Sequence, residues 1–239
     1  TKTDNATITV NVININDNAP AIANTSTSVA ENTNADSALL NLSDSNTGND
    51  TDNDGEALTY SITAGNDAGL FSINTTSGVL SIASGKALDF ETATTHVLTV
   101  QASDGTKTDN ATITVNVINI NDNTPVVADN VVEALETITP GTEITDLKDN
   151  LTTNDNDRDG DAISYSITSG NEEGLFAIEA ATGKITLATK KSLDFDTRDQ
   201  HILQIIATDG ANTDTAQITI NVLDSNTAPT ANNDSGTIN

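Results

Sequence analysis

Acidic residues recur in this 239-residue sequence at a nearly fixed spacing, and they are its best candidates for chemistry. Carboxylates form four groups, and each group occurs once in each half of the chain. The groups in the first half are Glu31; Asp50, Asp52, Asp54 and Glu56; Asp89 and Glu91; and Asp104. Their counterparts in the second half are Glu133; Asp155, Asp157, Asp159 and Asp161; Asp194 and Asp196; and Asp209. The offset is 105 residues throughout, except that Glu31 and Glu133 are paired at 102.

Carboxylates gathered in this way point to a bound cation. Two of them about 5 Å apart repel by about 3 kcal/mol at an effective dielectric of 20. For the acidic groups expected where the two halves of the chain join, only Arg158 lies near enough in sequence to neutralise them. The chain has no cysteine, so the ligands are oxygens. Such ligands favour Ca²⁺, which accepts about six to eight oxygens in flexible geometry, over Mg²⁺, which prefers a strict octahedron. Calcium is therefore the predicted cofactor.

The overall composition supports cations as partners. Nine basic residues against 35 acidic ones give a net charge of -26, which argues against binding to nucleic acid or to anionic lipid. An acidic chain can also be disordered, but repeated strands rich in Val, Ile and Thr argue against that alternative. The lack of cysteine excludes a disulfide framework without fixing the compartment, because metal can stabilise an extracellular domain instead.

An internal repeat sets the domain organisation. Residues 106–123 repeat residues 1–18 letter for letter, so the period of 105 residues is that of a whole domain. Within this stretch, Ala111 to Ile118 alternates apolar and polar residues as a half-buried strand does. We therefore expect four segments: the last strand of a preceding repeat at 1–18, repeat 1 at 19–123, repeat 2 at 124–227, and the start of a following repeat at 228–239.

Short β-rich runs separated by turn residues predict the fold of each repeat. Repeat 1 has seven such runs, at 21–29, 39–42, 58–63, 70–73, 79–82, 97–102 and 111–118. Seven short strands in about 100 residues are typical of a β-sandwich. The six aromatic residues form three pairs 105 apart in or beside these runs, so we expect them in the core. The prediction is an all-β chain of tandem seven-stranded Greek-key sandwiches joined end to end.

Strand alternation sorts the acidic groups to opposite ends of each sandwich. The loops after the second and sixth strands lie at one end, where they carry Asp157, Asp159 and Asp209 in repeat 2. The loops after the first and fifth strands lie at the other end with the exit of the seventh strand. The oxygen-rich segment 119–123 follows that last strand directly.

These residues resemble the signatures of cadherin repeats. Glu31-Asn32, Leu88-Asp89-Phe90-Glu91, Ala102-Ser103-Asp104 and Asn16-Asp17-Asn18-Ala19-Pro20 are similar to PEN, LDRE, AxD and DxNDNxP, and Asp157 and Asp159 match the DxD. The similarity covers nearly the whole chain. The amino-acid composition, which is rich in Asn and Thr and free of cysteine, also resembles that of the cadherin-like arrays in large bacterial surface adhesins of the RTX or biofilm type.

The resemblance implies calcium sites between successive repeats. The complete site would use Glu31, Asp89, Glu91, Asn119, Asn121, Asp122, Asn123, Asp157, Asp159 and Asp209. A flanking site before repeat 1 would use Asn14, Asp17, Asn18, Asp52, Asp54 and Asp104. A flanking site after repeat 2 would use Glu133, Asp194, Asp196 and Asp224.

Other interpretations of the same residues are weaker. The DxDxDG loops could be EF-hand loops, but position twelve of the loop is Ser61 or Ser166 instead of the required Glu. They could also be solvated turns that bind no ion. Paired carboxylates could indicate a glycosidase, yet they are spread over domain ends without an aromatic cleft. His96 and His201 have no nucleophile or metal partner near them in sequence, so we interpret them as structural. The chain is predicted not to be an enzyme.

The sequence thus predicts an extracellular, cell-surface adhesin region. Calcium would stiffen the joints between neighbouring repeats for cell adhesion or biofilm formation. The alternative is that the repeats bind a ligand themselves, either a polysaccharide or another copy of the adhesin.

Overall fold

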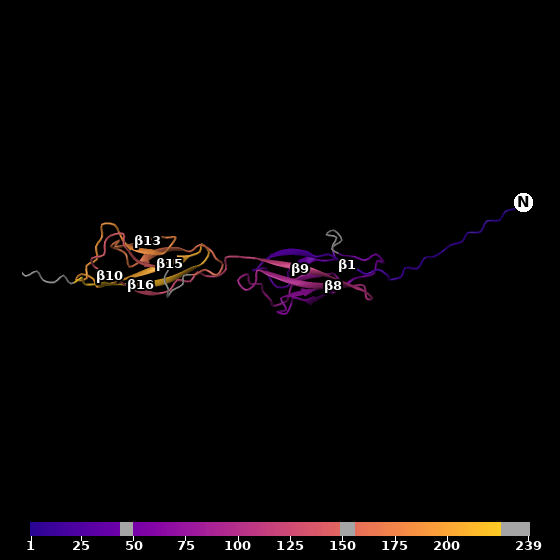
Figure 1. The fold of residues 1–239 in the computed structure, drawn as a ribbon, viewed down its shortest axis with the longest axis horizontal. Helices are drawn as coiled ribbons and strands as arrows, with labels where there is room; N and C mark the ends of the chain where they lie inside the picture. Colours follow the sequence, from indigo (N-terminus) through magenta and orange to yellow (C-terminus); the bar gives the residue numbers. More distant parts are fainter. Residues whose placement is uncertain (44–49, 149–155, 226–239) are drawn as a thin grey trace, which may run out of the picture. The chain divides into compact units, whose positions relative to one another are not determined.

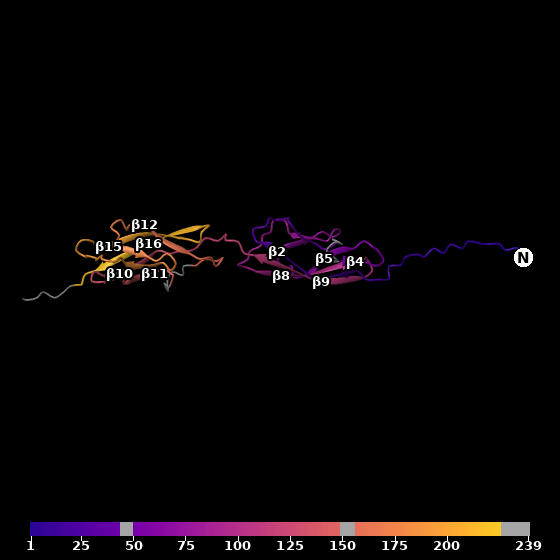
Figure 2. The same cartoon turned by 90° about the horizontal axis from the view of Figure 1, so that it is seen from above.

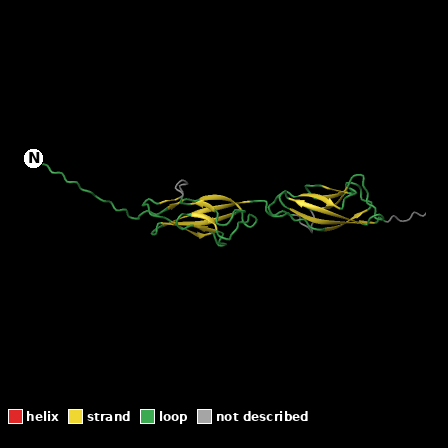
Figure 3. Ribbon diagram, turned by 180° about the vertical axis from the view of Figure 1, so that it is seen from behind, coloured by secondary structure: helices red, strands yellow, loops and turns green. Residues whose placement is uncertain are grey.

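The computed structural model describes residues 1–43, 50–148 and 156–225. All regular structure in these residues is β-strand, and no helix occurs that could cross a membrane (Figure 3). The chain divides into two compact units, residues 1–120 (unit 1) and 121–239 (unit 2), which are described separately. The all-β prediction is confirmed, while the predicted segment 228–239 lies outside the described residues.

Unit 1 is a sandwich of two sheets with the strand orders β2-β9-β8-β5 and β3-β7-β6 (Figures 1 and 2). A short additional pair, β1 with β4, lies outside these sheets. The strands are β1 Ala21–Ile22, β2 Thr25–Ala30, β3 Ala38–Asn41, β4 Asp50–Thr51, β5 Thr59–Ala64, β6 Phe71–Ile73, β7 Val79–Ile82, β8 Thr95–Ser103 and β9 Thr108–Ile118.

Unit 2 repeats this arrangement with the strand orders β10-β16-β15-β12 and β11-β14-β13. Its strands are β10 Asn130–Leu135, β11 Glu143–Asp146, β12 Ser164–Ser169, β13 Phe176–Ile178, β14 Lys184–Leu187, β15 Gln200–Thr208 and β16 Thr213–Leu223. In both units the first long strand pairs parallel with the last, and the last two strands form an antiparallel hairpin. Each unit is therefore the predicted sandwich.

The predicted first strand at 21–29 is wrong in one respect, because it divides into β1 and β2. Side chains bind the backbone on both sides of the break. The backbone N–H of Ile22 donates to Asp109 Oδ2 at 3.0 Å, and that of Thr112 donates to Asn24 Oδ1 at 2.7 Å. These bonds replace the regular ladder between residues 22 and 25, so the chain leaves β1 before it pairs with β9.

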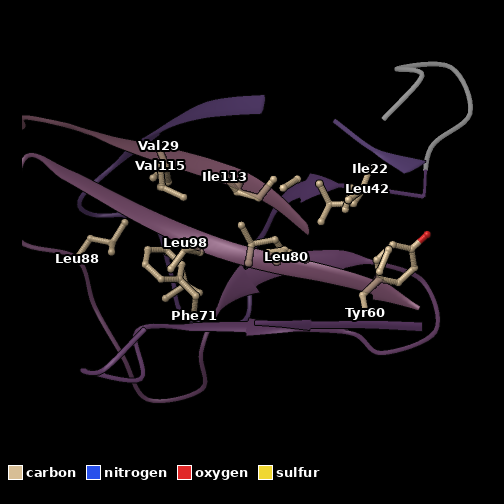
Figure 4. Packing of buried hydrophobic residues seen from close by; sticks show 14 of the residues in the cluster. Ile22, Val29, Leu42, Tyr60, Phe71, Leu80, Leu88, Leu98, Ile113 and Val115 are labelled. Carbon is tan, nitrogen blue, oxygen red and sulfur yellow. The ribbon is translucent and has the colours of Figure 1, made fainter. Parts of the chain in front are cut away.

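The core of unit 1 lies between its two sheets (Figure 4). Along β9 the buried side chains are Ala111, Ile113, Val115 and Val117, which is the predicted alternation. Residues of the smaller sheet, such as Leu80, face them from the other side. All six aromatic side chains belong to the two cores as expected: Tyr60, Phe71, Tyr165 and Phe176 are buried, and Phe90 and Phe195 are partly buried and pack against them.

Residues 1–18 differ from their identical copy at 106–123. The copy contains the central strand β9, whereas residues 1–18 form no strand. Ile8 and Val12 of this first segment are 85% and 92% exposed. A strand needs hydrogen-bonded neighbours. The same amino-acid sequence therefore forms a strand between β2 and β8 but not at residues 1–18, where these strands do not flank it.

Strand pairing sorts the loops of each unit to two ends. In unit 1 the N–H of Glu31 donates to the carbonyl of Ile118, and that of Val117 donates to the carbonyl of Thr94. The loops that follow β2 and precede β8 therefore meet the exit of β9. At the opposite end, Ser103 pairs with Thr108 in the β8–β9 hairpin and with Thr59 at the start of β5.

Candidate metal centres

Each unit gathers oxygen ligands at the end that carries the hairpin between its last two strands, and we call this set the upper cluster. Several side chains of each set bind one another or a common stretch of backbone. The upper cluster of unit 1 is Asn14, Asp17, Asn18, Asp52, Asp54, Glu56 and Asp104. The upper cluster of unit 2 is Asn121, Asp122, Asn123, Asp157, Asp159, Asp161 and Asp209.

One aspartate anchors the incoming chain in each upper cluster. Asp54 Oδ2 accepts from the backbone N–H groups of Asp17 and Asn18 at 2.8 and 2.6 Å, while its Oδ1 accepts from Asn18 Nδ2. Asp159 binds the backbone of Asp122 and Asn123 in the same way, at 3.0 and 2.8 Å. The backbone bond from Asn18 is the main reason that the pKa of Asp54 is lowered.

A second aspartate in each loop has a buried oxygen with no donor. Asp52 Oδ1 accepts from the N–H of Asp54 at 2.9 Å, and Asp157 Oδ1 accepts from that of Asp161 at 3.3 Å. The Oδ2 atoms of Asp52 and Asp157 are buried without a hydrogen-bond partner among the described residues, and Asp157 is only 7% exposed. A buried carboxylate oxygen without a donor is costly, so these atoms fit a bound cation.

Like charge accumulates around these aspartates. Oxygens of Asp52, Asp54 and Glu56 lie within 4.8 Å of one another, as do those of Asp157, Asp159 and Asp161. Burial raises the pKa of Glu56, and the charges of Asp52 and Asp54 raise it further. Glu56 and Asp161 were not among the predicted ligands, although their positions next to the DxDxDG loops were visible in the sequence.

The β8–β9 hairpin and its counterpart in unit 2 each add one carboxylate to the upper cluster. Asp104 Oδ1 accepts from the N–H groups of Thr106 and Lys107, both at 2.6 Å. Asp209 Oδ1 accepts at 2.7 Å from Ala211 and from Asn212. The N–H of Lys107 is the main cause of the lowered pKa of Asp104. Both aspartates are thereby held in place by their own turn.

The opposite end of each unit carries a second set, which we call the lower cluster. Its central residue in unit 1 is Glu31, which is 4% exposed. Glu31 Oε2 accepts from the N–H of Phe90 at 2.6 Å, and its Oε1 accepts from that of Ile120 at 2.8 Å. Glu31 thus joins three segments that are distant in sequence. An oxygen of Glu91 lies within 4.8 Å of one of Glu31, and the other predicted residues, Asp89 and Asn119, directly precede Phe90 and Ile120 in the chain; we include all three in the lower cluster of unit 1.

In unit 2 the residue equivalent to Glu31 is Glu136, and the predicted equivalence with Glu133 is wrong. Glu136 Oε2 accepts from the N–H of Phe195 at 3.1 Å, and its Oε1 accepts from that of Ser225 at 3.0 Å. Glu133 instead lies exposed within β10, opposite Asn221. The signal was present in the sequence, because Glu136 lies one full period of 105 after Glu31.

The remaining predicted ligands of unit 2 are more exposed. Asp194 binds Thr197 through both its oxygens, at 3.2 Å to the N–H and 2.8 Å to the hydroxyl, as Asp89 binds Thr92. Asp196 and Asp224 are exposed on the surface. Asp155, the first acid of the second loop, lies outside the described residues.

The two histidines contact aromatic rings. His96 and His201 pack edge-on against Phe71 and Phe176, with ring centroids 5.3 and 5.2 Å apart. His201 is 3% exposed, and burial lowers its pKa. This packing agrees with the structural role that we expected for both residues.

Comparison with known families gives one match that covers both units. The Cadherin domain family matches residues 25–118 and 131–223. Human Protocadherin Fat 1 is 34% identical over 181 residues, which are 71% of this chain and 4% of that protein. The Fat-like cadherin-related tumor suppressor homolog of Drosophila melanogaster is 33% identical over 175 residues, 70% of this chain and 4% of its length. The chain thus spans a small fraction of these relatives.

Solved structures give the same fold. The crystal structure of mouse Cadherin-23 EC22-24 has a TM-score of 0.66 at 24% identity, with 87% of this chain and 67% of that chain covered. The crystal structure of human Protocadherin-24 EC1-2 has a TM-score of 0.65 at 24% identity, with 87% and 99% covered. The fold comparison therefore agrees with the family match.

Proposed function

Since this chain belongs to the cadherin family, we propose that its units are calcium-binding repeats whose joints stiffen when the cation binds. It is a tandem cadherin repeat region of the extracellular, cell-adhesion type. The observation that carries the calcium proposal concerns Asp157 Oδ2. This oxygen is buried next to the carboxylates of Asp159 and Asp161, and no hydrogen-bond donor among the described residues contacts it. Ca²⁺ would supply the positive charge that this oxygen lacks.

The available donors fit calcium. The upper clusters offer carboxylates together with the side chains of Asn14, Asn18, Asn121 and Asn123, and they contain neither sulfur nor imidazole. Such hard oxygen sets suit Ca²⁺, and carboxylates that are already anchored by backbone N–H groups require little reorganisation to bind it. We therefore propose that the upper clusters hold the ion through Asp52, Asp54 and Asp104 in unit 1, and through Asp157, Asp159 and Asp209 in unit 2.

The residues that anchor the lower cluster of unit 1 and the upper cluster of unit 2 are close together in the sequence. The N–H of Ile120 binds Glu31, and the N–H of Asp122 binds Asp159. Only Asn121 separates these two residues, so their Cα atoms are at most about 8 Å apart. We propose that the lower cluster of unit 1 (Glu31, Asp89, Glu91, Asn119) also supplies calcium ligands. We propose a third, outer site at Glu136, Asp194, Asp196 and Asp224.

Calorimetry and small-angle X-ray scattering test this function together. We expect Ca²⁺ to bind the chain with measurable heat and to change its maximum dimension relative to a chelator-treated sample. Asp157→Asn should weaken binding, while Asp67→Asn, outside both clusters, should not. An unchanged maximum dimension with normal binding would contradict stiffening, and absence of binding would contradict the calcium site itself.

A second candidate is association with another copy of the chain. Val131 and Leu135 project from β10 and are 65% and 52% exposed, whereas their counterparts in unit 1 are Ser26 and Ala30. Exposed apolar side chains on one sheet face favour a protein partner. Sedimentation of the native chain and of Val131→Ser tests this candidate, which predicts weaker self-association in the variant.

Binding of polysaccharide has less support. A groove of about 460 Å³ on unit 1 is lined by Asp36, Ser72, Ile73, Asn74, Ser77, Val79 and Ser81. It contains no aromatic ring on which a sugar could stack. A role as a non-catalytic spacer agrees better with this lining. A glycan array would test whether the chain binds polysaccharide.

The parent molecule that we propose is a cell-surface adhesin of the bacterial, biofilm type. The support is compositional: the chain contains no cysteine, no methionine and no tryptophan, and it is rich in Asn and Thr. Deletion of the parent gene in its host, followed by a biofilm assay with and without calcium, would test this origin.

A further inference from the structure

The two upper clusters have the same fold but differ in charge at one position of the hairpin between their last two strands. Lys107 and Asn212 lie 105 residues apart and follow Asp104-Gly105 and Asp209-Gly210 in the equivalent hairpins. The backbone N–H of each donates to the aspartate of its hairpin, at 2.6 Å in unit 1 and 2.7 Å in unit 2. At this position of the hairpin the backbone contact is the same, and the side chains differ by one positive charge.

The side chain of Lys107 reaches into the upper cluster of unit 1. Its ammonium nitrogen Nζ donates to the backbone carbonyl of Asp17. The neighbouring N–H of Asp17 binds the carboxylate of Asp54, and the charge of Lys107 helps to lower the pKa of Asp54. The ammonium group therefore acts as a resident cation close to the carboxylates that would bind calcium.

Asn212 holds the corresponding chain segment in unit 2 without a charge. Its Nδ2 donates to Asn121 Oδ1 at 3.3 Å and to the carbonyl of Asn123 at 3.0 Å. Unit 2 has one cation nearby, Arg158, but this residue is exposed and forms no ion pair with the described residues. The side chain that takes the place of Lys107 in unit 2 is therefore a neutral amide.

A fixed positive charge opposes the binding of a divalent cation. Even at the dielectric constant of water, an ammonium group about 6 Å from Ca²⁺ weakens binding about tenfold, and the effect grows where solvent is excluded. A neutral amide at the same place has no such effect. The charge difference between Lys107 and Asn212 is thus large enough to separate the affinities of the two clusters.

We propose that Lys107 sets a low calcium affinity at the upper cluster of unit 1, and that Asn212 permits a high affinity at that of unit 2. Repeats with Lys at this position would load calcium only at high concentration, whereas repeats with Asn would stay loaded as calcium falls. The stiffness of such an array would then be graded along the chain. This inference rests on the calcium function proposed above and concerns how that function is tuned.

Three substitutions in the full 239-residue chain test the proposal by calcium titration calorimetry. Lys107→Asn should raise the affinity of the unit 1 site about tenfold or more, and Lys107→Arg, which keeps the charge, should leave it low. Asn212→Lys should weaken the unit 2 site by a similar factor. Each variant is compared with the native chain at the same site, so differences between the surroundings of the two clusters do not affect the comparison.

Two control variants remove a positive charge at other positions, so they show whether the effect depends on where the charge lies. Arg158→Asn introduces the residue that unit 1 has at position 53, and Lys86→Asn removes a lysine from the loop before β8. Both should change affinity less than threefold. Equal tightening by Lys107→Asn and Arg158→Asn would overturn the proposal, as would an unchanged isotherm for Lys107→Asn. Absence of calcium binding in every variant would instead overturn the proposed function.

Discussion

At the scale of single residues, one glutamate holds the lower end of each unit together, buried in unit 1 and partly buried in unit 2. Glu31 and Glu136 each accept backbone N–H groups from two loops that are distant in sequence. Hydrogen bonds to an ionised acceptor are stronger than neutral ones. The glutamate therefore stabilises its unit in addition to any role toward a metal.

Glu136→Gln should lower the melting temperature of unit 2 by roughly 5 °C. A glutamine has one acceptor oxygen in place of two, so it cannot serve the N–H groups of both Phe195 and Ser225. Glu133→Gln, on the exposed face of β10, should shift the melting temperature by about 1 °C or less. Scanning calorimetry in chelator measures both, and equal shifts would contradict the assignment of Glu136.

The stability of unit 2 should fall as the pH is lowered below 6.5. Burial lowers the pKa of His201 in the folded unit, so the unfolded chain binds the proton more readily. Stability is thus complete above the ordinary pKa of 6.5 and decreases as the pH falls toward the lowered value. Urea titrations between pH 8 and 5 measure this slope. A slope that persists unchanged in His201→Gln would show that another group titrates.

At the scale of elements, a glycine permits close packing where β5 meets β8. Gly65 has a φ of 81°, and a Cβ at this position would overlap the carbonyl oxygen of Val97. Gly170 has the same environment beside Ile202 in unit 2. Both features follow from the bulge at the end of the β5 and β12 strands. The fold therefore depends on glycine at these two positions.

Gly65→Ala should destabilise unit 1 by about 3 kcal/mol, because the left-handed backbone and the overlap both act against the side chain. Gly69→Ala is a matched control, since its φ is 64° but no atom lies within 4 Å of the added Cβ. The control should cost about 1 kcal/mol. Urea denaturation of both variants distinguishes the two effects, and similar losses would show that the overlap is relieved easily.

At the scale of the whole molecule, the net charge of -26 opposes folding when no cation is bound. In chelator, raising NaCl from about 20 mM to 500 mM should therefore increase the melting temperature by several degrees, because salt screens the carboxylates. In saturating calcium the same change of salt should have a smaller effect. Thermal melts followed by circular dichroism test this, and an equal salt dependence in both conditions would argue against neutralisation by calcium.

Much of the fold and part of the site could be predicted from local sequence patterns. The alternation in residues 111–118 fixes which side chains of β9 are buried, because successive side chains of a strand point to opposite faces. The upper clusters could be predicted because the DxDxDG loops and the Asp-Gly hairpins recur at the period of the repeat. Glu136 was missed because Glu133 also follows a β-rich run, and only the hydrogen bonds to Phe195 and Ser225 distinguish the two.

The sequence by itself determined the two-unit organisation, the strands and the acidic composition of their ends, since these depend on residue type and spacing. Tertiary structure alone decided the division of β1 from β2, the buried oxygen of Asp157 and the position of the Lys107 ammonium group. The physical reason is visible in residues 1–18 and 106–123. Their letters are identical, yet only the second segment contains a strand, because the hydrogen bonds that define a strand come from distant parts of the chain.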